Sequence, residues 1–138
     1  SMNAYKGHGE TILIVDDQEN QRTIACSLLN TLYYQTDAVT SGEEAIAYLQ
    51  QQKADLVLLD MIMEPGMNGR ETYEQILKIN PEQKVIIASG FSEDEEIKKI
   101  HALGVIQFMK KPYTIDQIGI AIKQALRNGR PAVSTLGG

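Results

Sequence analysis

Short apolar runs alternate along the chain with longer stretches in which apolar residues recur every three or four positions. Such runs, bounded by polar or turn-forming residues, are typical of strands buried on both faces of a sheet. The longer stretches are typical of amphipathic helices. The predicted strands are residues 11–15, 34–39, 55–59, 84–88 and 105–109, and the predicted helices are residues 19–32, 42–52, 70–79, 93–103 and 115–127.

Capping residues mark several of the helix boundaries. Ser41 is a predicted N-cap, and Glu44, three residues later, is its predicted capping-box partner. Ser92 and Thr114 precede the last two helical stretches and are also expected to act as N-caps. Gly104 is typical of the residue that follows a helix C-terminus. These signals agree with the boundaries that the apolar periodicity predicts.

Strands and helices alternate five times, which indicates a parallel sheet with helices on both faces. We therefore predict an α/β fold: a flavodoxin-like, doubly wound five-stranded parallel sheet in the order 2-1-3-4-5, with five helices. Residues 10–128 are expected to form this single domain. Residues 1–9 are expected to be a tag remnant and flexible lead-in, and residues 129–138 a disordered tail or linker.

Composition narrows the classes of protein. The chain has 138 residues, enough for one domain with a substantial core. Its net charge of -5 argues against direct nucleic-acid binding. Cys26 is the single cysteine, so a disulfide framework and a cysteine-based zinc site are excluded. No apolar run approaches the roughly 18 residues of a membrane helix, and no signal peptide is visible, so we expect a cytoplasmic protein without membrane contact.

Asp60 follows the most apolar of the predicted strands. Residues 56–59 are all apolar, and the loop after Asp60 contains Pro65, Gly66 and Gly69, which cannot easily continue a strand. Asp60 is therefore expected at the carboxyl end of a central strand. In open α/β sheets this edge is where ligands bind.

The other strands next to this one also end in polar residues. Asp16 and Asp17 follow the first strand, Ser89 follows the apolar part of the fourth, and Lys111 follows the fifth. In the predicted strand order these groups converge with Asp60 on one crevice. Each has an ordinary explanation when it is taken alone: a helix cap, a turn residue or a surface lysine. Their joint occurrence, each at the end of its own strand, favours a site.

Three neighbouring carboxylates repel one another unless a cation lies among them, and oxygen ligands with room for water suit Mg²⁺. A carboxylate beside Mg²⁺ can act as a nucleophile toward phosphorus and form an aspartyl-phosphate. Phosphoryl transfer mainly requires positioning and charge neutralisation. Lys111 and Ser89 can contact two of the phosphoryl oxygens, and Mg²⁺ can contact the third.

Four motifs carry a resemblance to a known family. ILIVDD, LLD, ASG and FMKKPY, at residues 12–17, 58–60, 88–90 and 108–113, are similar to those of receiver domains, the phospho-accepting modules of two-component signalling. The resemblance covers about residues 10–127. It implies that Asp60 is the phospho-acceptor. It also implies a set of supporting roles: Mg²⁺ ligation by Asp16, Asp17, Asp60 and the backbone carbonyl of Ile62, a switch pair of Ser89 and Phe108, and an active-site lysine at Lys111.

The loop after the acceptor departs from the family pattern. Receiver domains usually read Asp-x-x-Met-Pro-x-Met-Asp-Gly here, whereas residues 60–69 of this chain are one residue longer and place Glu64 before Pro65. Asn68 stands where the family usually has an acidic residue. The path of this loop, and with it the Ile62 carbonyl, is therefore the part of the site that the resemblance defines least.

The resemblance implies a signalling switch, not an enzyme for an outside substrate. A histidine kinase or phosphotransfer protein would donate the phosphoryl group, and the downstream partner or attached output domain is open. A homodimer through the fourth helix, fifth strand and fifth helix is one implied arrangement, and the chain could come from a hybrid sensor kinase. Two alternative functions are a haloacid-dehalogenase-type phosphatase, which would need a second Asp where Ile62 stands, and a receiver-like interaction module that is never phosphorylated.

Overall fold

The computed structural model describes residues 2–90, 98–99, 102–104 and 107–128. Five parallel strands form one sheet in the order β2-β1-β3-β4-β5, which confirms the predicted order and the flavodoxin-like fold. The strands are β1 (Thr11–Val15), β2 (Gln35–Val39), β3 (Leu56–Asp60), β4 (Val85–Ser89) and β5 (Gln107–Lys110). The helices are η1 (Met2–Tyr5, a 3-10 helix), α1 (Glu19–Thr31), α2 (Gly42–Gln51), α3 (Gly69–Ile79) and α5 (Ile115–Asn128).

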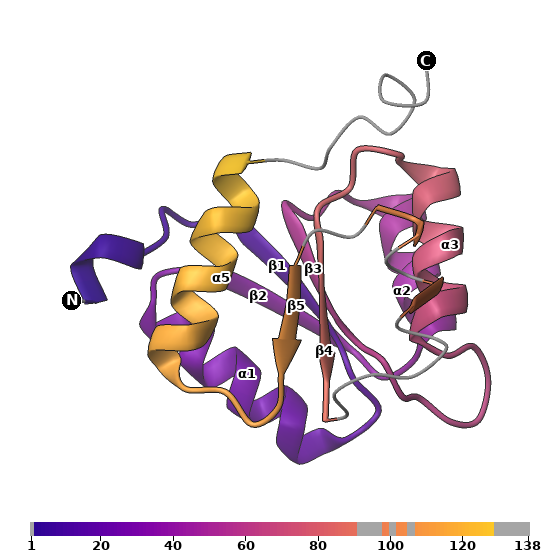
Figure 1. Cartoon of the computed structure of the whole chain (residues 1–138), viewed down its shortest axis with the longest axis horizontal. Coiled ribbons are helices and arrows are strands. Elements are labelled where there is room, and N and C mark those ends of the chain that lie inside the picture. The colour runs from indigo at the N-terminus through magenta and orange to yellow at the C-terminus, as the bar shows by residue number, and fades with distance from the viewer. Residues whose placement is uncertain (1, 91–97, 100–101, 105–106, 129–138) are drawn as a thin grey trace.

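Helices cover both faces of the sheet. Figure 1 shows α1 and α5 on one face and α2 and α3 on the other. Alternation along each central strand divides the core in the same way: Leu56 and Leu58 pack with α1 and α5, whereas Val57 and Leu59 pack with α2 and α3. Burial on both faces explains why this strand is an unbroken apolar run.

The helix count differs from the prediction. Four α-helices lie in the described part of the chain, not five. The predicted helix at residues 93–103 falls largely outside the described residues, as do its expected cap Ser92 and the tail at residues 129–138. Within the described residues, none of the helices combines the length and apolar character that crossing a bilayer requires.

The predicted caps are largely confirmed, with one shift. Ser41 Oγ accepts a hydrogen bond from the Glu44 backbone N–H at 3.1 Å. The Glu44 carboxylate, however, accepts from the backbone N–H of Thr40 at 2.6 Å, so it reaches one residue further back than a capping box requires. Thr114 and Gln117 do form a reciprocal pair, with backbone N–H to side-chain oxygen distances of 3.1 and 2.9 Å.

The lead-in makes contacts with the rest of the domain that the apolar pattern did not predict. Tyr5 is only 7% exposed, belongs to the core cluster beneath α1 and α5, and donates a hydrogen bond from its hydroxyl to the Asp116 carboxylate. A Cβ on Gly119 would lie only 2.3 Å from the Tyr5 ring, so the ring packs directly against the backbone of this glycine. Gly7 N–H also donates to the Leu32 carbonyl at 2.7 Å. One aromatic ring and a few backbone bonds hold this segment, so no apolar periodicity marked it in the sequence.

Candidate functional site

The predicted site residues converge because the strands are parallel. Asp16 and Asp17 directly follow β1, Asp60 and Ser89 are the last residues of β3 and β4, and Lys111 directly follows β5. Parallel strands bring their carboxyl ends to one edge of the sheet. The register places Asp60 opposite Ala88, one residue before Ser89. The structure therefore brings together the residues that the strand ends predicted.

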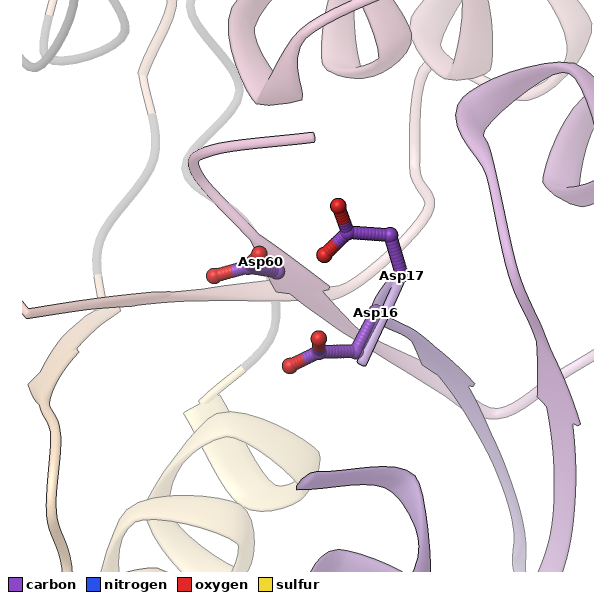
Figure 2. A group of neighbouring side chains, drawn as sticks. All are labelled: Asp16, Asp17 and Asp60. Carbon is purple, nitrogen blue, oxygen red and sulfur yellow. The ribbon is translucent and has the colours of Figure 1, made fainter. Parts of the chain in front are cut away.

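Three carboxylates meet at the centre of this edge. One oxygen each of Asp16, Asp17 and Asp60 lies within 4.8 Å of the others. Figure 2 shows the three side chains entering the same space from the ends of β1 and β3. Asp16 is 5% exposed and Asp60 is 8% exposed, whereas Asp17 lies on the solvent side. This donor set consists only of hard oxygen atoms and is open on one side, which fits a Mg²⁺ ion that keeps several water ligands.

Lys111 supplies the positive charge nearest to these carboxylates. Its Nζ lies 2.7 Å from Asp16 Oδ2 and 3.0 Å from Asp60 Oδ1, so it bridges the two buried acids. The Lys111–Pro112 peptide bond is cis, and the Lys111 backbone N–H donates to the Ser89 carbonyl at 2.8 Å. The lysine is thus fixed to the end of β4 through its backbone and to β1 and β3 through its side chain.

Burial and like charge shift the pKa of the proposed acceptor. Burial raises the pKa of Asp60 from 3.8 to about 6, the charges of Asp16 and Asp17 add to the rise, and Lys111 partly opposes it. Burial by itself would lower the pKa of Lys111, but its hydrogen bonds and charge interactions with Asp16 and Asp60 outweigh burial and raise it. Around neutral pH the site therefore holds an ionised Asp60 carboxylate beside a protonated Lys111 amine.

Ser89 and Phe108 lie on one face of the sheet beside this pocket. Phe108 pairs with Ile87 across β4 and β5, and Ser89 lies two residues beyond Ile87 on the same face. Ser89 is buried, and Phe108 is half-buried and packs against the core cluster of α2 and α3. The geometry is compatible with a coupled pair of side chains.

The longer loop after β3 is anchored at both of its ends. Met61 N–H donates to the Ala88 carbonyl at 3.0 Å, and the Met61 carbonyl accepts from Gly69 N–H at 3.0 Å. A Cβ on Gly69 would lie 2.7 Å from the Asp60 carbonyl oxygen, so this close approach requires glycine. Met61 and Met63 are both buried in the core, and Ile62 between them is 45% exposed. The backbone of Ile62 thus lies between two residues whose side chains are anchored in the core.

Asn68 has a structural role at the start of α3. Its side-chain oxygen accepts from the Glu71 backbone N–H at 2.9 Å, and the Glu71 carboxylate accepts from the Asn68 N–H at 3.0 Å. This capping box begins α3 directly after the loop.

Two residues near the site had no signal in the sequence. Arg22 donates from Nη1 to the Asp16 carbonyl at 2.9 Å, which ties the loop after β1 to α1. Glu43, in the first turn of α2, accepts from the Met67 N–H at 3.1 Å. Each of these side chains lies on a helix and hydrogen-bonds a backbone group of a loop. Charged residues at such helix positions are common, so the sequence pattern did not predict either contact.

Comparisons with known proteins agree with this geometry. The chain matches the model of the response regulator receiver domain over residues 12–123. It is 37% identical over 117 residues to sporulation initiation phosphotransferase F of Bacillus subtilis, covering 85% of this chain and 94% of that protein. It is 36% identical over 121 residues to response regulator protein VraR of Staphylococcus aureus, covering 84% of this chain and 56% of that protein.

Solved structures show the same fold. The N-terminal domain of a response regulator/sensory box/GGDEF 3-domain protein from Carboxydothermus hydrogenoformans matches with a TM-score of 0.80 and 27% identity, covering 86% of this chain and 94% of that one. A CheY-like response regulator receiver domain protein from Methanospirillum hungatei matches with a TM-score of 0.81 and 25% identity, with the same coverage of 86% and 94%. This chain belongs to the response regulator receiver domain family, the switch modules of two-component signalling.

Proposed function

We propose that Asp60 accepts a phosphoryl group from a histidine kinase or a phosphotransfer protein. The observation that carries this proposal is the environment of Asp60: a buried carboxylate at a strand end, between two further carboxylates and a lysine that contacts it at 3.0 Å. Sporulation initiation phosphotransferase F, whose name describes group transfer, matches this chain over 94% of its own length, which supports the proposal.

In the proposed step, an Asp60 carboxylate oxygen attacks the phosphorus of a phosphohistidine. The new P–O bond forms as the P–N bond breaks, and the electron pair of that bond returns to the imidazole nitrogen of the donor. Lys111, which bridges Asp16 and Asp60 in this structure, turns its ammonium group toward a phosphoryl oxygen and offsets the developing negative charge. The hydroxyl of Ser89 donates to a second oxygen.

The residues that would hold Mg²⁺ are Asp16, Asp17, Asp60 and the backbone carbonyl of Ile62. When bound, the ion would neutralise the three carboxylates and the oxygens of the incoming phosphoryl group. In the metal-free chain, Lys111 opposes the repulsion among these acids through its contacts with Asp16 and Asp60.

Phosphorylation then acts as a switch. Ser89 moves toward the phosphoryl group, Phe108 turns into the space that Ser89 leaves, and the surface of the predicted fourth helix, β5 and α5 changes. This is a population shift driven by contacts that exist only in the phosphorylated state. The surface would bind a downstream partner or a second copy of the chain. The domain acts on itself and not on an outside substrate, and it works in the cytoplasm, where histidine kinases consume ATP.

A phosphatase of the haloacid-dehalogenase type is not favoured. Its acid/base aspartate would stand two residues after the nucleophile, and Ile62 occupies that position with no group that can exchange a proton.

The test is treatment with acetyl phosphate and Mg²⁺ followed by intact mass measurement. The wild-type chain should gain the mass of one phosphoryl group, and Asp60→Asn, as well as wild-type chain in excess EDTA, should gain none. An adduct that persists in Asp60→Asn would place the acceptor elsewhere. A wild-type chain that gains no adduct from acetyl phosphate or from a phosphorylated phosphotransfer domain would favour an interaction module that is never phosphorylated.

A further inference from the structure

The middle of the loop between β3 and α3 rests on the first turn of α2. Glu43 Oε2 accepts a hydrogen bond from the Met67 backbone N–H at 3.1 Å. Gly66 has φ +102°, and a Cβ on it would lie 2.7 Å from Glu43 Oε2 and 3.1 Å from Oε1. Gly42, the residue before Glu43, also lies close to the loop, since a Cβ there would lie 3.3 Å from the Met67 Cβ. The loop therefore turns tightly under the Glu43 carboxylate.

Among the described residues, this part of the loop makes no other hydrogen bond to a separate element. Backbone bonds at Met61 and Gly69 close the base of the loop, and Met63 is buried in the core. Among the described residues, the bond from Met67 N–H to Glu43 is the hydrogen bond that ties residues 62–67 to a different secondary-structure element. The extra residue of this loop lies in the same stretch, so the bond to Glu43 limits the additional conformational freedom that a longer loop has.

We propose that Glu43 is a positioning residue for the metal site. By holding Met67 it defines the path of residues 62–66, and so it defines where the Ile62 carbonyl faces the acidic pocket. The inference rests on the proposed function, because it takes the Ile62 carbonyl as a Mg²⁺ ligand. Partners that orient the ligands of a metal commonly change its affinity by 10- to 100-fold when they are lost.

Glu43 could act through its negative charge instead of through its hydrogen bond, and two substitutions separate these effects. Glu43→Gln keeps an oxygen that accepts from Met67 N–H and removes the charge. Glu43→Ala removes both. Glu82→Ala is the matched control, because it removes an exposed carboxylate from the turn before β4, at the opposite edge of the sheet.

Two measurements on the full chain test the inference. Isothermal titration with Mg²⁺ should show about tenfold weaker binding for Glu43→Ala and binding within about twofold of wild type for Glu43→Gln and Glu82→Ala. Hydrogen exchange of the metal-free chain should show faster exchange of the Met67 amide in Glu43→Ala and wild-type exchange in Glu43→Gln. Because the second measurement needs no metal, it reports directly on the hydrogen bond from Met67 N–H to Glu43.

Wild-type affinity in Glu43→Ala would overturn the inference, as would Glu43→Gln binding as weakly as Glu43→Ala, because charge would then be the cause. Gly66→Ala provides a second route if Glu43→Ala does not fold, since its Cβ would displace the same carboxylate and should weaken Mg²⁺ binding to a similar extent. A wild-type chain that binds no Mg²⁺, or an Asp17→Asn variant that binds it normally, would instead show that the proposed metal site is wrong.

Discussion

The amino edge of the sheet, where the strands begin, and the carboxyl edge, where they end, both bury polar groups, but the groups differ in charge. At the amino edge, the buried Gln83 side-chain amide donates to the carbonyls of Ala54 and Lys84 at 3.1 and 3.2 Å. At the carboxyl edge, Asp16 and Asp60 are buried near a third carboxylate, and Lys111 bridges them. The buried polar group at the amino edge is thus a neutral amide with hydrogen-bond partners, whereas the carboxyl edge holds three neighbouring carboxylates.

This difference separates stability from function. Neutral buried groups with partners stabilise a fold modestly and do so at any ordinary pH. Buried carboxylates that repel one another destabilise it, and the raised pKa of Asp60 measures part of that cost. The carboxyl edge is therefore strained in the metal-free chain, and a cation or a phosphoryl group with its cation would relieve the strain.

The largest expected effect is at Lys111. Replacing it by Met leaves Asp16 and Asp60 buried without a cation, so we expect the metal-free chain to lose about 3 kcal/mol of unfolding free energy at pH 7. Urea unfolding in EDTA measures this. Lys53→Met, which removes an exposed lysine, is the control and should change the free energy by less than about 0.5 kcal/mol. Equal losses in the two variants would contradict the account of the carboxyl edge.

The next effect concerns Asp60 and pH. Because its pKa is raised to about 6 in the folded chain from an ordinary value of 3.8, the folded state binds the proton more tightly than the unfolded state. The contribution of Asp60 protonation to the free energy of unfolding is fully present below about pH 4 and is lost as the pH rises through about 6. Asp60→Asn should therefore stabilise the metal-free chain by about 2 kcal/mol at pH 7, and the gain should shrink toward pH 4.

Urea unfolding of wild type and Asp60→Asn across pH 4 to 8, in EDTA, gives this comparison. Asp55→Asn is the matched substitution at the amino edge, where the carboxylate is exposed and accepts from Thr11 N–H at 2.8 Å. We expect no gain of stability from it at pH 7. A gain in Asp60→Asn that does not vary with pH would exclude protonation as its cause.

A smaller effect is expected at Gln83. Gln83→Met keeps the length of the side chain but removes the donor to the Ala54 carbonyl and one of the two donors to the Lys84 carbonyl, which keeps its bond from Val57 N–H. We therefore expect a loss of about 1.5 kcal/mol of unfolding free energy. Since the group is neutral, the loss should be the same from pH 5 to 8 and with or without Mg²⁺. Chemical unfolding under the four combinations of low and high pH, with and without the metal, tests this. A loss that depends on Mg²⁺ would mean that the two edges are coupled.

The smallest expected effect is a gain at Tyr34. Its hydroxyl is buried and has no hydrogen-bond partner within the described part of the chain, and burial raises its pKa to about 12. Tyr34→Phe removes the unpaired hydroxyl and should stabilise the chain by up to about 1 kcal/mol. Tyr48→Phe is the contrast, because the Tyr48 hydroxyl donates to Asp37 at 2.6 Å. Thermal unfolding should place Tyr34→Phe above wild type and Tyr48→Phe at or below it.

Much of the fold and the candidate site was predictable because regular structure leaves a periodic signal. Buried parallel strands are short apolar runs, and the residue after each run lies at a known edge of the sheet. These local patterns predict Asp16, Asp60 and Lys111 at one edge of the sheet. The lead-in escaped them, since Tyr5 packs by a single ring. The loop after Asp60 escaped them as well, because backbone bonds and one distant carboxylate hold it.

The sequence by itself determined the alternation of strands and helices and the residues at the strand ends, because these depend on local patterns of apolar and polar positions. Only the tertiary structure decided how those residues interact. Lys111 lies 95 positions from Asp16 and 51 from Asp60, yet it bridges both. The raised pKa of Asp60 and the hydrogen bond from Met67 N–H to Glu43 likewise depend on burial and on distances between separate elements. Packing sets these quantities, and packing has no local signature in the chain.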